Sequence, residues 1–314
     1  MNRFIKIHQR HSQKIGIMSE MNAILFAVLA ALFVSTTSIA VRLGTERSKS
    51  SDILAVVIAV NLIVFIPLAF AIHYPDHGLT FRSIGAFIVA GIVGTVLARS
   101  LFYEGIRHIG ASRAEPIKAS NPVIAAIAAV ILLGETLSLG NIIGILMIFA
   151  GVALVSVEIA TNKEKLKISL RGVMITLLAS FFYALDPVFN KMGLEEGTPI
   201  LVGLALKATA GAIVFFAYLW WSGKLPKLAA MKDSRWRWMV IAAIGNTGFL
   251  IAYFIAISSG PVTIVFPIMQ TSPLLVAGIS FLFLQRLERV TLKLVMGAGV
   301  VVMGAVLLAL LSLA

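Results

Sequence analysis

The chain has 314 residues, of which 59% are hydrophobic and 13% charged; an ordinary soluble domain, with roughly 25% charged residues, is therefore excluded. The net charge of +12 does not indicate nucleic-acid binding, because the basic residues lie in short gaps between apolar segments and are not interleaved with aromatics. This distribution is typical of loops that meet anionic lipid headgroups, so we expect a membrane protein.

Apolar segments of about 20 residues, long enough for a membrane-spanning helix, follow one another along the chain. Residues 1–21 form a polar N-terminal tail before the first of them, and Met1, Met18 and Met21 are alternative starts. Helical rather than strand-like periodicity predicts an all-α integral membrane fold. The ten predicted spans are 22–42, 53–72, 83–105, 111–133, 139–158, 170–191, 199–221, 237–257, 261–284 and 291–312.

Sequence patterns of enzymes and metal sites do not occur. The chain has no cysteine, and therefore no thiolate ligand or nucleophile. His73 and His77 are separated by Pro75, which argues against a helix that would hold both on one face. No phosphate-binding loop, serine-hydrolase motif or zinc-protease motif is present. We therefore expect no cofactor, no metal and no enzymatic activity. Because no ATP-binding motif is present, any transport by this chain must be driven by a gradient or by exchange.

One phrase of the sequence occurs twice. "EPIKASNP" at 115–122 aligns with "FPIMQTSP" at 266–273, so that the two prolines of each coincide. Other matches at offsets of 149 to 153 are Ala30 on Ala179, Gly44 on Gly193, Tyr103 on Tyr253, Gly110 on Gly260, Glu135 on Glu288, Gly144 on Gly297 and Gly151 on Gly304. We therefore predict a first repeat at 22–158, a linker loop at 159–169 and a second repeat at 170–314. Five spans per repeat would insert the second copy upside down, as in many secondary transporters.

The segment "RSLFYEGIRHIGASRAEPIKASNPVIAAIAAVILLGETLSLGNIIGILMIFAGVAL" resembles the repeat unit of the drug/metabolite transporter superfamily, in its EamA branch. The small-residue turn, the proline of the fourth helix, the "GE" after that helix and the glycines of the fifth carry the resemblance. The second copy has "QRLER" in place of "GET". The resemblance implies a ten-helix transporter with a central cavity. It leaves the substrate open, since the superfamily handles amino acids, sugar nucleotides, phosphorylated sugars and drugs.

Charged residues inside the predicted spans mark candidate positions for a binding site, because each costs about 2.5–3.5 kcal/mol at a helix centre unless it is compensated. Arg99 and Tyr103 are four residues apart and share one helix face. Arg99 is about two turns from the end of its helix, so it either snorkels to the interface or forms a polar cavity wall with Tyr103. Lys207 lies about two turns into its span, where it either faces a cavity or snorkels to the interface. Asp186 is either structural, a counter-ion for Lys207, or a proton carrier.

The duplicated phrase predicts a broken helix in each repeat. Pro122 removes a hydrogen bond to the carbonyl of Lys118, so the lysine and a freed carbonyl fall at the same turn. Glu115 either pairs with Lys118 or leaves it to face a cavity. The predicted hinges are Pro116, Pro122, Pro267 and Pro273. The predicted substrate-binding residues are Arg99, Tyr103, Lys118, Asp186, Lys207, Asn246 and Gln270.

The balance of buried charge indicates the class of substrate. The cations expected to be buried are Arg99, Lys118, Lys191 and Lys207, against the anions Glu104, Glu115 and Asp186. This excess favours an anionic or zwitterionic metabolite, such as an organic acid, an amino acid or a phosphorylated compound. We predict a multi-pass secondary transporter of the cell membrane, monomeric or homodimeric, whose partners are this substrate and membrane lipid. The alternatives are a transporter of lipid-linked or amphipathic compounds and drugs, and a non-transport membrane protein.

The orientation in the membrane stays open. Lysine and arginine gather in the odd-numbered loops, which by the positive-inside rule places both termini outside. The superfamily resemblance implies the opposite, with both termini inside.

Overall fold

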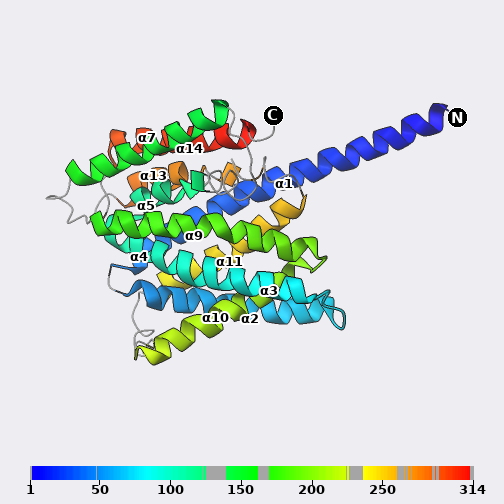
Figure 1. Cartoon of the computed structure of the whole chain (residues 1–314), viewed down its shortest axis with the longest axis horizontal. Coiled ribbons are helices and arrows are strands. Elements are labelled where there is room, and N and C mark those ends of the chain that lie inside the picture. Colours follow the sequence, from blue (N-terminus) through cyan, green and yellow to red (C-terminus); the bar gives the residue numbers. More distant parts are fainter. Residues whose placement is uncertain are drawn as a thin grey trace.

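The computed structural model describes residues 2–46, 48–121, 123–124, 139–161, 170–223, 225, 236–259, 265, 268–269, 271–284, 287 and 290–311 (Figure 1). These residues form helices and no strands. In chain order the helices are α1 (Asn2–Gly44), α2 (Ser50–His73), α3 (Phe81–Ala90), η1 (Gly91–Ala98), α4 (Arg99–Ile109), α5 (Ala111–Lys118), α7 (Leu139–Thr161), α9 (Leu170–Glu195), α10 (Ile200–Trp221), α11 (Trp236–Ser259), α13 (Ser272–Phe283) and α14 (Leu292–Leu311).

Six helical segments of the described chain are long and apolar enough to cross a membrane: Met21–Gly44, Ser50–His73, Phe81–Ile109, Leu170–Glu195, Ile200–Trp221 and Trp236–Ser259. A helix suits lipid because it satisfies its own backbone hydrogen bonds. Large apolar side chains such as Ile63, Ile213 and Ile244 are exposed on the outside of these helices, where lipid would cover them. The chain is therefore a multi-pass membrane protein.

The helices differ from two of the predicted spans of the first repeat. α1 is helical from Asn2, so the predicted polar tail continues the first span as one helix whose N-terminal part extends beyond the other helices (Figure 1). The predicted span 83–105 is divided among α3, η1 and α4, and η1 is a π-helix. Such π segments are rare and often lie at functional sites.

Helix packing brings elements from the two halves of the chain together. α1 packs on α11, α9 packs on α3, η1 and α4, and α2 packs on α10. α7 and α14 pack on each other at one side of the molecule, opposite α2 and α10 (Figure 1). α5, α13, α9, α4 and α11 lie between these two outer pairs and surround the interior.

Glycines allow α7 and α14 to approach closely. A Cβ atom on Gly151 would lie 2.7 Å from the carbonyl oxygen of Gly297, and one on Gly304 would lie 2.8 Å from that of Gly144. No larger residue fits at these positions without moving a backbone. Small residues of this kind let helices pack in membranes, where apolar burial itself supplies little driving force.

Candidate functional site

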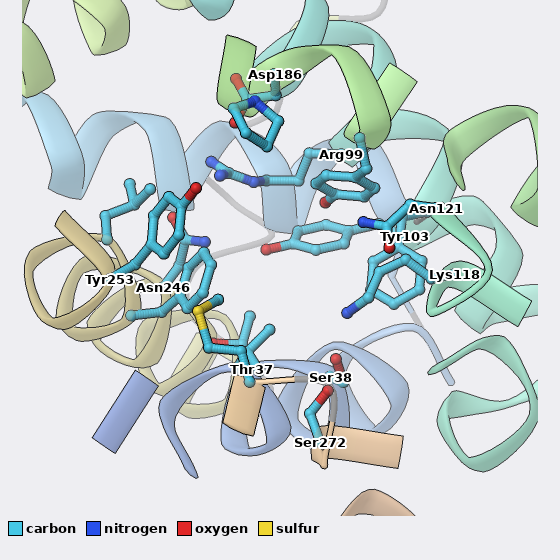
Figure 2. Close-up of a pocket in the computed structure, with 17 residues that line it drawn as sticks. Thr37, Ser38, Arg99, Tyr103, Lys118, Asn121, Asp186, Asn246, Tyr253 and Ser272 are labelled. Atoms are coloured by element: carbon cyan, nitrogen blue, oxygen red, sulfur yellow. The ribbon is translucent and has the colours of Figure 1, made fainter. Parts of the chain in front are cut away.

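A cavity of about 100 Å³ lies among α1, α4, α5, α9, α11 and α13 (Figure 2). One buried water needs only roughly 10–15 Å³, so the cavity has room for several waters or part of a small organic molecule. Its polar lining residues are Thr37, Ser38, Arg99, Tyr103, Lys118, Asn121, Tyr183, Asp186, Asn246, Tyr253 and Ser272. Val34, Phe102, Pro187, Phe249, Leu250 and Met269 complete the lining.

Five of the seven residues predicted from the sequence to bind substrate line this cavity: Arg99, Tyr103, Lys118, Asp186 and Asn246. Lys207 does not line it, although it is buried close by, behind Asp186. Gln270 lies outside the described residues. Sequence reasoning therefore located five of the eleven polar lining residues, including all three charged ones, but wrongly placed Lys207 in the cavity wall.

Arg99 is the first residue of α4, directly after the π-helix η1. It is 4% exposed, lines the cavity, and its Nη1 atom has no hydrogen-bond partner. The hydroxyl of Tyr103, one turn further along α4, is also buried without a partner. Buried polar groups normally find partners, so two unpaired ones at a single cavity indicate a site for a ligand that accepts hydrogen bonds.

Lys118 is the second cation of the wall, and it is already paired. Its Nζ lies 2.5 Å from Glu115 Oε2 and 4.5 Å from the centre of the Phe102 ring. Glu115 is fully buried and also accepts hydrogen bonds from the hydroxyls of Ser38 and Ser272. This carboxylate thus ties α5 to α1 and α13 and neutralises Lys118.

Asp186 is the acidic residue of the wall, and it too is neutralised. Lys207 Nζ donates to Asp186 Oδ1 at 2.7 Å and to Oδ2 at 2.9 Å, and to Asn190 Oδ1 at 3.2 Å. The amide of Asn190 donates back to Asp186 Oδ2 at 3.0 Å. Of the alternatives considered for these residues, the counter-ion arrangement is the one present, and Lys207 does not snorkel.

The charges at the cavity therefore sum to one positive charge. Lys118 is balanced by Glu115 and Asp186 by Lys207, whereas Arg99 has no carboxylate within salt-bridge distance among the described residues. The two ion pairs are each neutral, so Arg99 is the charge that remains to bind a ligand.

Two parts of the predicted buried-charge balance are wrong. Lys191 is exposed and pairs with exposed Glu195 one turn away, so it does not count as buried. Glu104 is half-buried and is shared by Arg107, His108 and the hydroxyl of Ser50, away from the cavity.

A buried ion pair that the sequence did not predict joins α5 to α7. Arg113 Nε donates to Glu158 Oε2 at 2.9 Å and Nη2 to Oε1 at 3.1 Å, and both side chains are almost fully buried. The hydroxyl of Thr291 also reaches Glu158 Oε1, at 3.4 Å. Arg113 lies at the start of the predicted span 111–133, and only the fold shows that it faces Glu158, 45 residues further along the chain.

The predicted hinge prolines occupy two different settings. Pro116 is buried inside α5, while Pro273 lies at the first turn of α13, where its missing N–H needs no partner. The expectation that Pro273 breaks a helix is therefore wrong, because it begins one. Pro122 and Pro267 lie outside the described residues.

The profile of the EamA-like transporter family matches residues 21–157 and again residues 170–310. The chain belongs to this family. The resemblance noted in the sequence is thereby confirmed, and the family occurs as two consecutive copies in the chain.

Curated relatives align with parts of the chain. "Uncharacterized transporter YyaM" of Bacillus subtilis (strain 168) is 25% identical over 181 residues, which cover 48% of this chain and 59% of that protein. "Uncharacterized transporter YcbK" of the same organism is 30% identical over 118 residues, 38% of each chain. "Uncharacterized transporter in sor 3'region" of Acidianus ambivalens is 28% identical over 123 residues, 39% of this chain and 46% of that protein. The chain matches at most 59% of the length of any of these three relatives.

A solved crystal structure shares the fold. It aligns with a TM-score of 0.64 over 93% of this chain and 98% of that one, at 17% sequence identity. At that identity the likeness extends to the fold alone.

The cavity wall is built largely from positions that correspond between the two copies of the EamA-like sequence. Fourteen of the 17 lining residues form seven such pairs. The pairs are Val34 with Tyr183, Thr37 with Asp186 and Ser38 with Pro187, 149 residues apart; Arg99 with Phe249 and Tyr103 with Tyr253, 150 apart; and Lys118 with Met269 and Asn121 with Ser272, 151 apart.

Four of the twelve lining residues that sequence reasoning missed could have been found from these offsets. Thr37, Phe249, Tyr253 and Met269 correspond to the predicted site residues Asp186, Arg99, Tyr103 and Lys118. Asn121 and Ser272 correspond to each other within the duplicated phrase, but neither was selected. Selecting residues one at a time overlooks positions whose partner in the other copy is a neutral or apolar side chain.

The turn inside the duplicated phrase has the same hydrogen bonds in both copies. The hydroxyl of Ser120 donates to the Ile117 carbonyl, and that of Thr271 to the Ile268 carbonyl, both at 2.7 Å. The N–H groups of Ser120 and Thr271 donate to the same two carbonyls, at 3.2 and 3.1 Å.

A further backbone hydrogen bond occurs in both copies of the duplicated phrase. Val123 N–H donates to the Ser120 carbonyl and Leu274 N–H to the Thr271 carbonyl, both at 3.0 Å. The Lys118 carbonyl, inside the turn from Ile117 to Ser120, accepts a hydrogen bond from the Ser180 hydroxyl at 3.1 Å. Each copy thus carries a tight turn beside the cavity, held by a hydroxyl.

Proposed function

We propose that this chain is a secondary transporter of the cell membrane that moves a small organic metabolite, with an anion favoured, by alternating access. In this proposal ten helices form two inverted repeats of five, at 22–158 and 170–314, joined by a linker at 159–169. The cavity is the substrate site, and the turns in the two copies of the duplicated phrase are hinges. The observation that carries the proposal is the cavity wall of seven pairs of corresponding residues.

The helix packing supports an exchange symmetry between the repeats. If the repeats are exchanged, α1 on α11 becomes α9 on the α3, η1 and α4 segment, and both packings occur. Likewise α2 on α11 becomes α10 on α3 and η1, and both packings are present. The pairs α2 with α10 and α7 with α14 map onto themselves.

The glycine contacts follow the same rule. Gly144 corresponds to Gly297 and Gly151 to Gly304, and the contact of Gly151 with Gly297 exchanges into that of Gly304 with Gly144. If the two repeats exchange conformations, a site at their interface changes the side of the membrane that it faces. Transporters of this architecture bind substrate at the repeat interface, beside discontinuous helices.

The proposal can be tested without knowing the substrate, because the chain has no cysteine. A single cysteine would be introduced at Thr37, which is buried, lines the cavity and carries a side chain of similar size. Its labelling by a membrane-impermeant thiol reagent would be followed in right-side-out and in inside-out vesicles. Asp76→Cys, in the exposed loop between α2 and α3, is the control.

Alternating access predicts that the cysteine at position 37 is labelled from both sides, since the cavity faces each aqueous phase in turn. The cysteine at position 76 should be labelled from one side only, and that side also settles the orientation of the loop. If the cysteine at position 37 reacts from one side only, the cavity belongs to a receptor-like or structural membrane protein, and the transport proposal is wrong.

A further inference from the structure

We infer that the cavity selects an organic anion of single charge that carries an apolar, ring-sized body and no ammonium group. The inference rests on the proposed function and narrows it from small polar metabolites to amphipathic monoanions. It excludes amino acids, phosphorylated sugars and small hydrophilic acids from the preferred substrates. Three properties of the cavity wall lead to it.

The first property is the single unpaired charge. Arg99 is more than nine-tenths buried, lines the cavity and keeps Nη1 without a partner, and the Tyr103 hydroxyl beside it is unpaired as well. A guanidinium and a phenol together offer a carboxylate several donors, and charge-assisted hydrogen bonds are the stronger kind. One such group matches one negative charge. A doubly charged phosphate would require a second free cation, and Lys118 is committed to Glu115 at 2.5 Å.

The second property is the apolar side of the wall. Where the first repeat has Arg99 and Lys118, the second has Phe249 and Met269. The Phe249 ring stacks on that of Tyr253, with centres 5.8 Å apart and planes at 9°. Figure 2 shows Tyr253 and Asn246 on the α11 side of the cavity, across from Tyr103 and Lys118. A substrate with its carboxylate at Arg99 thus has an aromatic and thioether surface for the rest of its body.

The third property is that the described wall residues offer no place for a positive charge. An ammonium group needs a carboxylate or several free acceptors. Both oxygens of Asp186 accept from Lys207, and the carboxylate of Glu115 accepts from Lys118. An ammonium placed in the cavity would instead meet the uncompensated charge of Arg99. In a zwitterion, the unfavourable energy of placing the ammonium group near Arg99 therefore offsets the favourable energy of binding the carboxylate.

Four small molecules isolate these properties, with binding measured by isothermal titration calorimetry on the purified full chain in detergent. 3-Phenylpropionate has the ring and the anion. 3-Phenylpropanamide keeps the ring without the charge, phenylalanine adds an ammonium, and propionate lacks the ring. We expect 3-phenylpropionate to bind roughly 10- to 100-fold more tightly than each of the others, the worth of one charged hydrogen bond or one buried ring.

A pair of variants on α4 ties this selectivity to Arg99. Arg99→Gln should abolish the advantage of 3-phenylpropionate over 3-phenylpropanamide, and Arg99→Lys should restore part of it, because the ammonium keeps the charge but not the fork of donors. Arg107→Gln is the matched control. It lies two turns further along the same helix, is partly exposed and pairs with Glu104, so the binding ratio should not change.

Several outcomes would overturn the inference. Equal binding of phenylalanine would show that the wall accepts an ammonium, and equal binding of propionate would show that the apolar side is not used. Failure of all four compounds to bind at millimolar concentration would also reject it, as would an unchanged ratio in a folded Arg99→Gln or Arg99→Lys protein.

These results are independent of the transport test. Two-sided labelling of the cysteine at position 37 with no preference for 3-phenylpropionate would leave a transporter of another substrate class. Selective binding with one-sided labelling would leave an anion-binding membrane protein that does not transport.

Discussion

Lys207 and Asp186 form a bidentate ion pair, with Nζ 2.7 Å from Oδ1 and 2.9 Å from Oδ2, and only Asp186 reaches the cavity. The lysine therefore neutralises the carboxylate of the described cavity wall from behind, without lining the cavity itself. Arg99 is left as the lining cation without a compensating carboxylate among the described residues.

Removing one member of this pair should be costly. Lys207→Met leaves an unpaired buried carboxylate, and Asp186→Asn an unpaired buried ammonium, so each should lower the free energy of unfolding by about 3–5 kcal/mol. The double variant should recover most of that loss, because no uncompensated charge remains. Unfolding by denaturing detergent, followed by circular dichroism, measures all three. Additive losses in the double variant would show that the two residues do not act as a pair.

Lys191→Met is the matched control for the lysine change. Lys191 and Glu195 pair at 3.6 Å with both side chains well exposed, and exposed pairs contribute about 0–1 kcal/mol. In addition, Lys207→Met should weaken binding of 3-phenylpropionate, because an uncompensated Asp186 carboxylate in the cavity wall would repel an anion. The double variant, which removes the competing carboxylate charge, should bind again.

Close packing of α7 on α14 gives a second prediction. Gly151→Ala would place a methyl group 2.6 Å from Val301 Cγ2 and 2.7 Å from the Gly297 carbonyl, and overpacking of this kind costs about 1–3 kcal/mol. Gly299→Ala on α14 meets nothing within 4 Å and should be neutral or slightly stabilising, since alanine is the better helix former. Equal melting temperatures for the two variants would contradict the close packing described for α7 and α14.

The Arg113–Glu158 pair should be one of the main structural links of the first repeat. Arg113→Met should destabilise the fold by about 3–5 kcal/mol, because Glu158 would stay buried with its main partner gone. Arg107→Met, at a partly exposed pair, should cost less than about 1 kcal/mol. Neither variant should alter which of the four small molecules binds best. A change in that preference would place Arg113 in the binding site, contrary to its position in the structure.

The turns of the duplicated phrase should depend on their hydroxyls more than on Pro273. Thr271→Val and Ser120→Ala each delete a 2.7 Å hydrogen bond to a carbonyl and should cost about 1 kcal/mol. Pro273→Ala should cost less, since proline at the first turn of a helix replaces no hydrogen bond. Hydrogen exchange at the Leu274 amide, which bonds across the turn, reports the difference. A greater loss of protection in Pro273→Ala would restore the proline as the element that forms the break.

Much of the site could be predicted from the sequence because the cost of a charge in lipid is a strong local signal. Arg99, Lys118 and Asp186 stand out in apolar segments, and all three line the cavity. The same signal could not tell which charges face the cavity and which face each other. That depends on helix rotation, so Lys207 was placed in the wall and Lys191 among the buried residues.

Features that depend on pairing between distant helices were missed for the same reason. Arg113 and Glu158 each look like residues near a membrane interface until α5 and α7 are packed together. The π-helix η1 has no mark in the sequence beyond its glycines, of which Gly94 lies against Asp186 and leaves no room for a side chain. The duplicated phrase was the more informative signal, because it carries information about both halves of the wall at once.

The pairing of Arg99 with Phe249 has a consequence for how such a protein can arise. Two identical subunits around a twofold axis would supply every wall residue twice, so an arginine at this position would bring two charges or, if replaced, none. A cavity holding an odd number of charges therefore requires two halves of different sequence. Two halves that are separate stretches of one chain can diverge in this way, while the positions that shape the cavity remain matched.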